Sequence, residues 1–169
     1  KNERDAYHSL DKISLILGSF RPAICINICE LDATSQFIPP LGDPARPKFF
    51  QWLAYLNNTL QVEYMLWRYA EKHTTDTQSA EGVRAAQAPR LADILALLDE
   101  ELDGKRFLLG DEVRGCDHFL FMLALWCEKL PRPPSTFVHL MRFMRGMSKR
   151  PAVQKVCEID GIDLSLYSQ

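Results

Sequence analysis

The spacing of apolar residues after residue 43 is the sequence feature that most restricts the fold. Apolar side chains recur there every three or four residues, the period of an α-helix, and prolines separate one such stretch from the next. The pattern predicts a helix from Asp43 onward, helices over about 80–103, 115–129 and 135–146, and a fifth opening at Pro151. Pro89 falls inside the second of these, where we expect a kink or a broken first section.

The helix that begins at Asp43 carries two apolar stripes. Asp43 suits the N-cap position and Pro44 the first helical position. One stripe holds Phe49, Trp52, Leu53, Leu56, Leu60 and Trp67, and the other holds Tyr55, Val62, Leu66 and Tyr69. A helix with two such stripes is expected to lie between two layers, or between a core and a cleft.

The first 40 residues follow a different pattern. Ile13, Leu15 and Leu17 alternate with their neighbours, which predicts a short strand, either alone or as half of a hairpin turned at residues 10–11. Pro22 then opens a predicted helix that ends at about Glu30. Because so short a strand is marginal alone, we expect this piece to pack on the helices or on another chain.

Length and composition exclude several classes of protein. The 169 residues suit one domain, or one domain plus a fragment, and 47% hydrophobic with 25% charged residues is typical of a globular chain. A net charge of -2 argues against a protein built to bind nucleic acid. No apolar run approaches the length of about 18 residues that a membrane span needs, so we expect no membrane partner.

The five cysteines are Cys25, Cys29, Cys116, Cys127 and Cys157. Their odd number and apolar neighbours favour buried thiols in a reducing, cytoplasmic compartment. The sequence contains no CxxC pair, so a structural zinc site is not expected. Cys25 and Cys29 share a helix face, which leaves a redox or metal role open beside simple packing. Cys116 follows Arg114 at a helix start, which could favour its thiolate, although burial is the simpler interpretation.

Charged residues in the helices are expected to form solvated faces. This applies to Glu63 with Arg68, to Asp99, Glu100, Glu101 and Asp103, and to the basic stripe of Arg142, Arg145, Lys149 and Arg150. His118 beside Asp117 resembles an acid–base pair, but adjacent helical residues do not face each other.

Three stretches of the sequence point to one family. FIPPLGDPARPKFFQWLAYLNNTLQ from Phe37, FLLGDEVRGCDHFLFML from Phe107 and MSKRPAVQKV from Met147 resemble the C-terminal helical domain of bacterial glutathione S-transferases. RPAICINICELD from Arg21 is similar to the last helix of that family's thioredoxin-like half. The resemblance implies a mainly α fold, with a glutathione-transferase helical bundle over residues 39–169. A truncated thioredoxin-like remnant, a strand or hairpin plus one helix, would occupy residues 1–38.

The chain departs from the family pattern at three places. The family's thioredoxin-like half is much longer than the 40 residues here, and its catalytic loop has no counterpart in this sequence. Phe20 and Arg21 stand where the family has a Glu or Gln followed by a Ser that hold glutathione, so these glutathione-binding positions are degenerate. Arg114 replaces the Ser or Thr that caps the central helix, while Asp117 remains, and we expect Asp117 to be a structural cap.

The resemblance also implies a hydrophobic substrate cleft. Its candidate residues are Gln61, Tyr64, Met65, Trp67, Arg68 and Trp126. An aromatic and thioether wall of this kind suits an apolar acceptor. The alternative is that these side chains form an interhelix core beside one solvated arginine.

Two functions remain open from the sequence. The first is a glutathione-transferase-like module without catalysis, used for interaction or ligand binding, which forms a homodimer or binds a protein partner through the helices beginning at Asp43 and Ser79. It would need no cofactor and no metal. The alternative is a glutathione S-transferase that conjugates glutathione thiolate to hydrophobic electrophiles, with its catalytic part missing from this chain. Glutathione would then be a substrate.

Overall fold

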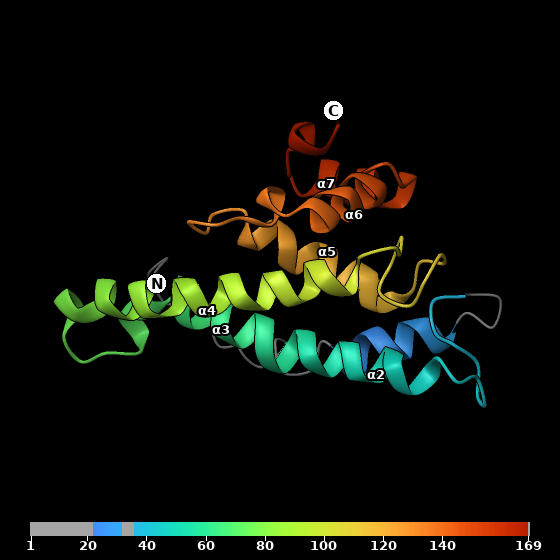
Figure 1. Ribbon diagram of the computed structural model, residues 1–169, viewed down its shortest axis with the longest axis horizontal. Coiled ribbons are helices and arrows are strands. Elements are labelled where there is room, and N and C mark those ends of the chain that lie inside the picture. The colour runs from blue at the N-terminus through green and yellow to red at the C-terminus, as the bar shows by residue number, and fades with distance from the viewer. Residues whose placement is uncertain (1–21, 32–35, 169) are drawn as a thin grey trace, which may run out of the picture.

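The computed structural model describes residues 22–31 and 36–168, and these residues form helices joined by loops (Figure 1). The helices are 22–31, α2 (Arg46–Tyr55), a π-helical turn (Leu56–Leu60), α3 (Gln61–Arg68), α4 (Ala80–Glu101), α5 (Gly115–Cys127), α6 (Val138–Ser148) and α7 (Pro151–Ile159). Within the described residues, strand-like pairing is limited to a bridge between Phe107 and Gly110. The mainly α fold is therefore confirmed, whereas the strand predicted at residues 13–17 lies outside the described residues.

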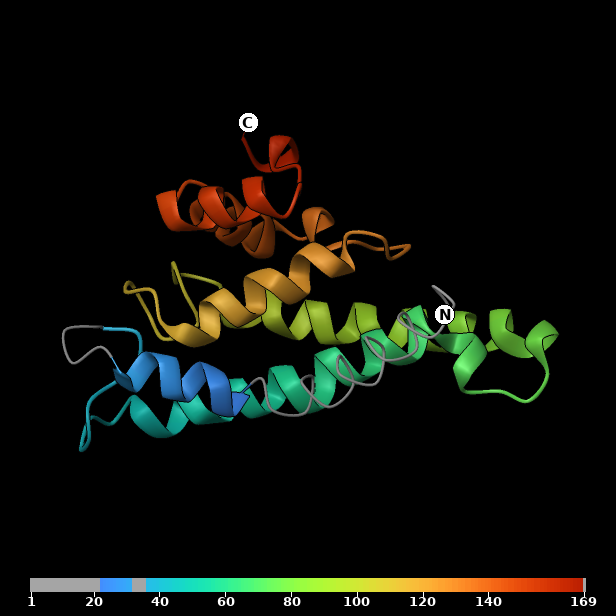
Figure 2. The same ribbon diagram turned by 180° about the vertical axis from the view of Figure 1, so that it is seen from behind.

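The helices stack in layers around α5. Figure 1 shows α3 and α4 side by side, α5 above them, and α6 with α7 in a further layer that carries the C-terminus. Figure 2 shows helix 22–31, in blue, beside α2 and against one end of α5. The core is lined by leucines of α4 and by the middle of α5 and α6, including Leu95, Leu98, Leu120, Leu140 and Met144, none of which is exposed. Nine of the thirteen residues of α5 are buried, as expected of a helix covered on all sides.

The start of α2 differs from the prediction. The helix begins at Arg46, so Pro47 and not Pro44 lies in its first turn. Asp43 Oδ1 accepts a hydrogen bond from the Ala45 amide at 2.8 Å, and the Asp43 carbonyl accepts one from Arg46 at 3.0 Å. Asp43 therefore closes a turn ahead of the helix, which is a common use of aspartate.

A π-helical turn joins α2 to α3 and explains the double stripe. Because its hydrogen bonds span one residue more than those of an α-helix, the buried face shifts around the axis at Leu56–Leu60. Phe49, Leu53 and Leu60 are at most 1% exposed and Tyr64 is 6% exposed, whereas Val62 of the second predicted stripe is 48% exposed. At Val62, therefore, the second predicted stripe faces solvent and is not part of the core.

Helix α4 continues through Pro89 without a break, so the broken first section predicted there does not form. Pro89 and Ala85, whose carbonyl loses its amide partner, both lie on the exposed side of the helix. Water can hydrate that carbonyl, which limits the cost of the proline.

Two charged residues that were predicted to be solvated tie α4 to α6. Asp99 Oδ1 accepts hydrogen bonds from the amides of His139 and Leu140, both at 2.7 Å, and so caps the start of α6. The Arg142 guanidinium donates to the carbonyl of Lys105 at 2.9 Å, just beyond α4. The prediction of solvated faces is wrong for these residues, because each binds backbone groups roughly forty positions away in the chain.

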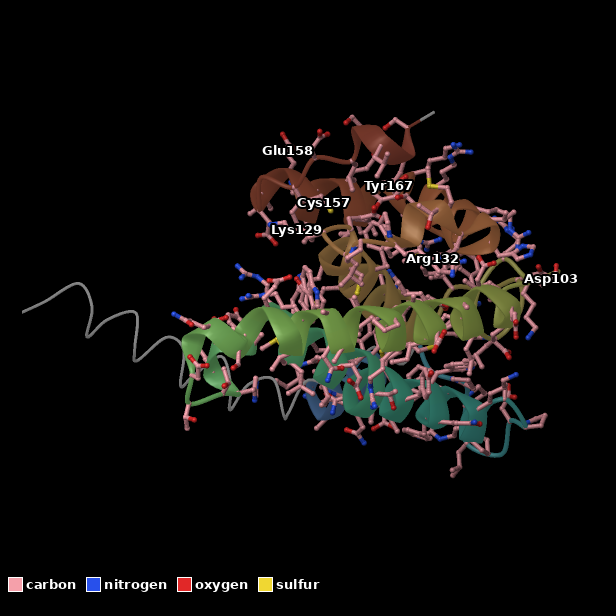
Figure 3. The ribbon with its side chains drawn as sticks, turned by 60° about the vertical axis from the view of Figure 1, so that its left-hand side comes forward. Asp103, Lys129, Arg132, Cys157, Glu158 and Tyr167 are labelled. Carbon is pink, nitrogen blue, oxygen red and sulfur yellow. The ribbon has the colours of Figure 1, made fainter. Side chains whose placement is uncertain are left out.

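The last described residues fold back onto the bundle. Tyr167 is 1% exposed and Cys157 of α7 is 4% exposed, and Figure 3 shows both in the C-terminal layer. Val156 of α7 points outward and is 56% exposed. Among the helices that the structure describes, none is both long and apolar enough to cross a membrane.

Candidate functional site

A cavity of about 430 Å³ opens between helix 22–31 and α5. Its lining is almost entirely apolar and comprises Ile24, Cys25, Ile28, Cys29, Phe37, Gly115, His118, Phe119 and Met122. The volume lies within the range of about 300–1,000 Å³ that is usual for small-molecule sites. We therefore take this cavity as the candidate functional site.

The spacing of residues in helix 22–31 builds one wall of the cavity. Ile24 with Ile28, and Cys25 with Cys29, are pairs four residues apart, so all four side chains lie on one side of the helix. Ile24 is 44% exposed and Ile28 61%, whereas Cys29 is only 5% exposed. The isoleucines consequently lie at the open side of the cavity, and the Cys29 thiol lies at its base.

Gly115, the first residue of α5, allows the two helices to approach closely. A Cβ atom at this position would lie 2.6 Å from Cys29 Sγ and 3.3 Å from Cys25 Sγ. The Gly115 amide also donates a hydrogen bond to the Phe37 carbonyl at 2.8 Å, which holds the loop after helix 22–31 against α5. Both sulfur atoms therefore converge on one point at the start of α5.

The two thiols at this point interact directly. A side-chain hydrogen bond between Cys25 and Cys29 raises the pKa of Cys25 and lowers that of Cys29, and burial raises the pKa of Cys25 further. Cys29 is thus the thiol of the pair that ionises more readily. Burial raises the pKa of Cys116 well above its ordinary value, so the helix start does not make that cysteine a thiolate.

His118 is the imidazole of the cavity wall. Its Nδ1 lies 3.1 Å from the Arg114 carbonyl, and because a carbonyl only accepts hydrogen bonds, Nδ1 carries a proton. Burial lowers the pKa of His118, which favours the neutral ring. The ring also meets Phe37 edge to face, with centroids 5.3 Å apart. His118 is therefore fixed in orientation by a carbonyl and a phenyl ring, and does not bond to Asp117.

Asp117 is buried at the start of α5. Its carboxylate accepts hydrogen bonds from the amides of Arg114 at 2.7 Å and Leu108 at 2.9 Å. Burial raises the pKa of Asp117 to about 6, although both amides favour the carboxylate. The Arg114 guanidinium carries only N–H donors, so it cannot accept a hydrogen bond from an amide as the family's hydroxyl does. The Gly115 amide donates its hydrogen bond to the Phe37 carbonyl.

Three of the six predicted cleft residues form an aromatic cluster. Tyr64 of α3 lies with its ring centroid 6.0 Å from that of Trp67 and 5.9 Å from that of Trp126 on α5. Tyr64 is buried and the two tryptophans are half-buried. The structure therefore brings together aromatic residues of α3 and α5.

The other predicted cleft residues are placed differently. Gln61 is buried, Met65 is half-buried against the core, and Arg68 is exposed with its guanidinium 5.3 Å from the Tyr69 ring centroid. None of the six lines the cavity beside helix 22–31. Their role in substrate binding stays a prediction, and the degenerate positions Phe20 and Arg21 lie outside the described residues.

The cavity is not among the sites that the sequence predicts. Ile24, Ile28, Phe119 and Met122 line it, and none of them is a predicted site residue. The signal that was present is the pair of isoleucines four residues apart on a short helix that also carries two cysteines. Among residues 22–31 and 36–168, no group of three or more His, Cys, Asp or Glu side chains is placed to hold a metal ion.

The family can be assigned from comparison with known proteins. The family model described as "Glutathione S-transferase, C-terminal domain" matches residues 57–151, which is more than half of the chain. The chain belongs to the glutathione S-transferase C-terminal domain family. The matched region runs from the π-helical turn before α3 to the start of α7. The resemblance predicted from the sequence is thus confirmed.

Individual proteins are similar to the chain in sequence or in fold. Glutathione S-transferase GstA of Escherichia coli O157:H7 is 25% identical over 128 residues, which are 75% of this chain and 60% of that protein. A sphingomonad glutathione S-transferase complexed with glutathione superposes with a TM-score of 0.73 at 21% identity, covering 85% of this chain and 68% of that one. BphK, a bacterial glutathione S-transferase in a ternary complex, gives a TM-score of 0.73 at 23% identity, covering 83% and 67%. The match thus spans 60% of the curated relative, which is less than two thirds of its length.

Proposed function

We propose that this chain is a binding module of the glutathione S-transferase family that performs no glutathione conjugation itself. The observation that carries the proposal is the apolar cavity between helix 22–31 and α5. Ile24 and Ile28 remain exposed at its open side, so an apolar ligand or partner surface would cover area that is now hydrated. The titratable side chains of its wall are two cysteines and a neutral histidine.

A glutathione titration tests the proposal. Isothermal titration of the 169-residue chain with reduced glutathione is expected to give no saturable heat at millimolar ligand. Conjugation of glutathione to a chlorinated dinitrobenzene should equal the uncatalysed rate at high protein concentration. Micromolar glutathione binding, or turnover proportional to protein concentration, would show that the proposal is wrong.

The second candidate function is conjugation itself. It is supported by the curated relative that is named a glutathione S-transferase and by the sphingomonad relative that was solved with glutathione. A group that activates the glutathione thiol would then have to come from residues beyond those of the cavity. The same two assays decide between the candidates, because only an enzyme gives both saturable binding and turnover.

We further propose that the exposed sides of α2 and α4 contact a second copy of the chain or a protein partner. The support is that both helices keep an exposed face, which includes Gln51 and Ala54 of α2 and Leu97 of α4. Sedimentation velocity at several concentrations measures self-association. A monomer at all concentrations would exclude the homodimer.

A further inference from the structure

We propose that Cys25 and Cys29 form a chelating site for a trivalent arsenical that carries one apolar group. The inference deepens the proposed function and rests on it, because it assigns a ligand class to the same cavity. It depends on three observations: the contact between the two thiols, the small number of other ligands near them, and the apolar space in front of them.

The first observation is the geometry of the sulfur atoms. Cys25 and Cys29 are one helical turn apart and hydrogen-bond through their side chains. Both sulfurs lie within 3.3 Å of the point that a Gly115 Cβ would occupy. A two-coordinate linear ion would need its sulfurs about 4.6 Å apart, twice a metal–sulfur bond of about 2.3 Å. Sulfurs in hydrogen-bond contact on one face suit an angular chelate better.

The second observation concerns the number of ligands. A tetrahedral metal such as zinc takes four protein ligands in a structural site. The buried Cys116 interacts electrostatically with the pair, but among the described residues no third His, Cys, Asp or Glu is placed to form a metal-binding group with the two thiols. A centre that is completed by two sulfurs and one carbon matches this donor set, and trivalent arsenic bearing one organic group is such a centre.

The third observation is the space available for the organic group. The cavity of about 430 Å³ is lined by Ile24, Ile28, Phe37, Phe119 and Met122 in addition to the thiols, Gly115 and His118. An apolar cavity of about 150 Å³ is enough to bind benzene. A phenyl ring attached to the arsenic therefore fits within the cavity with room to spare.

The chemistry requires no oxidant or reductant. An arylarsonous acid, R–As(OH)₂, reacts with the two thiols so that two S–As bonds form and two As–O bonds break. Each thiol proton leaves with one hydroxide as water, and arsenic remains trivalent throughout. Cys29 attacks first, because the hydrogen bond from Cys25 favours its thiolate, and Cys25 then closes the chelate.

The test uses phenylarsine oxide, which hydrates to the arylarsonous acid, and the whole 169-residue chain. Intact-mass spectrometry should show one adduct with loss of two waters, stable to excess monothiol and removed by a dithiol. Cys25→Ala and Cys29→Ala should each weaken binding at least 100-fold. Cys157→Ala is the matched control, since that thiol is also buried but lies in the C-terminal layer (Figure 3), and it should bind like the unmodified chain.

Two further measurements decide the proposal if a variant does not fold. On the unmodified chain, bound arsenical should protect Cys25 and Cys29 from alkylation, as mapped by peptide mass. Phenylarsine oxide should bind at least tenfold more tightly than the methyl compound. Protection of other cysteines, or an adduct that both single variants retain, would overturn the proposal.

Binding of an apolar fluorescent dye distinguishes failure of the arsenical site from failure of the proposed binding function. Dye binding needs the cavity and no thiol chemistry. Dye bound at the cavity without an arsenical adduct would overturn the dithiol site alone. The absence of both dye and adduct would overturn the binding function as well.

Discussion

At the scale of single residues, the start of α5 holds two closely packed positions, one at the cavity and one just behind it. Gly115 brings the backbone of α5 against the sulfurs of Cys25 and Cys29, and Asp117 accepts two backbone amides just behind it. The close approach at Gly115 and the burial of the Asp117 carboxylate should each have a measurable effect on the free energy of unfolding.

Replacing Gly115 with alanine should destabilise the chain. The added Cβ would lie 2.6 Å from Cys29 Sγ, so the two helices must separate or the thiol must move. Overpacking of this kind costs about 1–3 kcal/mol, measured by urea unfolding. Gly82→Ala in α4 is the control, because a Cβ there meets nothing within 4 Å and should add up to about 1 kcal/mol. Adding Cys29→Ala to Gly115→Ala should recover part of the loss. Equal stability of the two glycine variants would show that the close approach is absent.

Asp117 should give the stability a recognisable pH dependence. Its folded-state pKa of about 6 lies above the ordinary value of 3.8, so the folded chain holds this proton more tightly than the unfolded chain. The stabilisation from this group is therefore full below 3.8 and is lost as the pH rises through about 6. Asp117→Asn cannot titrate, so the unmodified chain should lose on the order of 2–3 kcal/mol relative to it between those limits. Urea unfolding of both proteins at pH 4 and pH 7 measures the difference. A gap that changes in the opposite direction would mean that the two amides outweigh burial.

At the scale of helices, the elements are joined by side chains that bind backbone ends. Asp99 on α4 caps α6, and Arg142 on α6 binds the chain just beyond α4. The two contacts run in opposite directions between the same pair of helices. Because hydrogen bonds are directional, these two contacts restrict the crossing angle of α4 and α6 more than apolar packing alone would.

Removing the Asp99 cap should destabilise α6 specifically. Asp99→Ala leaves the amides of His139 and Leu140 without their acceptor and should cost about 1–2 kcal/mol in urea unfolding. Glu100→Ala is the neighbouring control, since that side chain is exposed, and it should change stability by less than about 0.5 kcal/mol. Hydrogen exchange should speed up most at the first turn of α6. Uniform loss of protection over the whole chain would argue against a local cap.

The same elements show what the sequence can predict. The helices can be predicted from local information, because the apolar period and the prolines act between residues that are close in the sequence. The predicted first helical residue, Pro44, is two residues too early, because the Asp43 side chain bonds to Ala45 and delays the helix to Arg46. The role of Asp99 could not be predicted, because its partners lie about forty residues away. The cavity was missed for the same reason, since helix 22–31 and α5 meet only in three dimensions.

At the scale of the whole molecule, exposed apolar side chains occur at both ends of the stack. Ile24 and Ile28 border the cavity, whereas Val156 and Ile159 of α7 stand 56% and 73% exposed in the C-terminal layer. The two pairs are similar in chemistry and in exposure. They differ in that only the first pair borders a cavity, so a comparison of the two isolates what the cavity contributes to binding.

The double variant Ile24→Ser with Ile28→Ser should lower the affinity for an anilinonaphthalene dye at least fivefold in a fluorescence titration. The reason is that these side chains supply the outer wall of the apolar space into which the dye partitions. Both residues are 44% or more exposed, so their loss should leave the free energy of unfolding within about 1 kcal/mol of the starting value. The matched double variant Val156→Ser with Ile159→Ser should bind the dye as before, because those residues line no part of the cavity. If both double variants weakened the dye equally, exposed apolar surface in general would account for binding, and the cavity between helix 22–31 and α5 would lose its place as the binding site of this module.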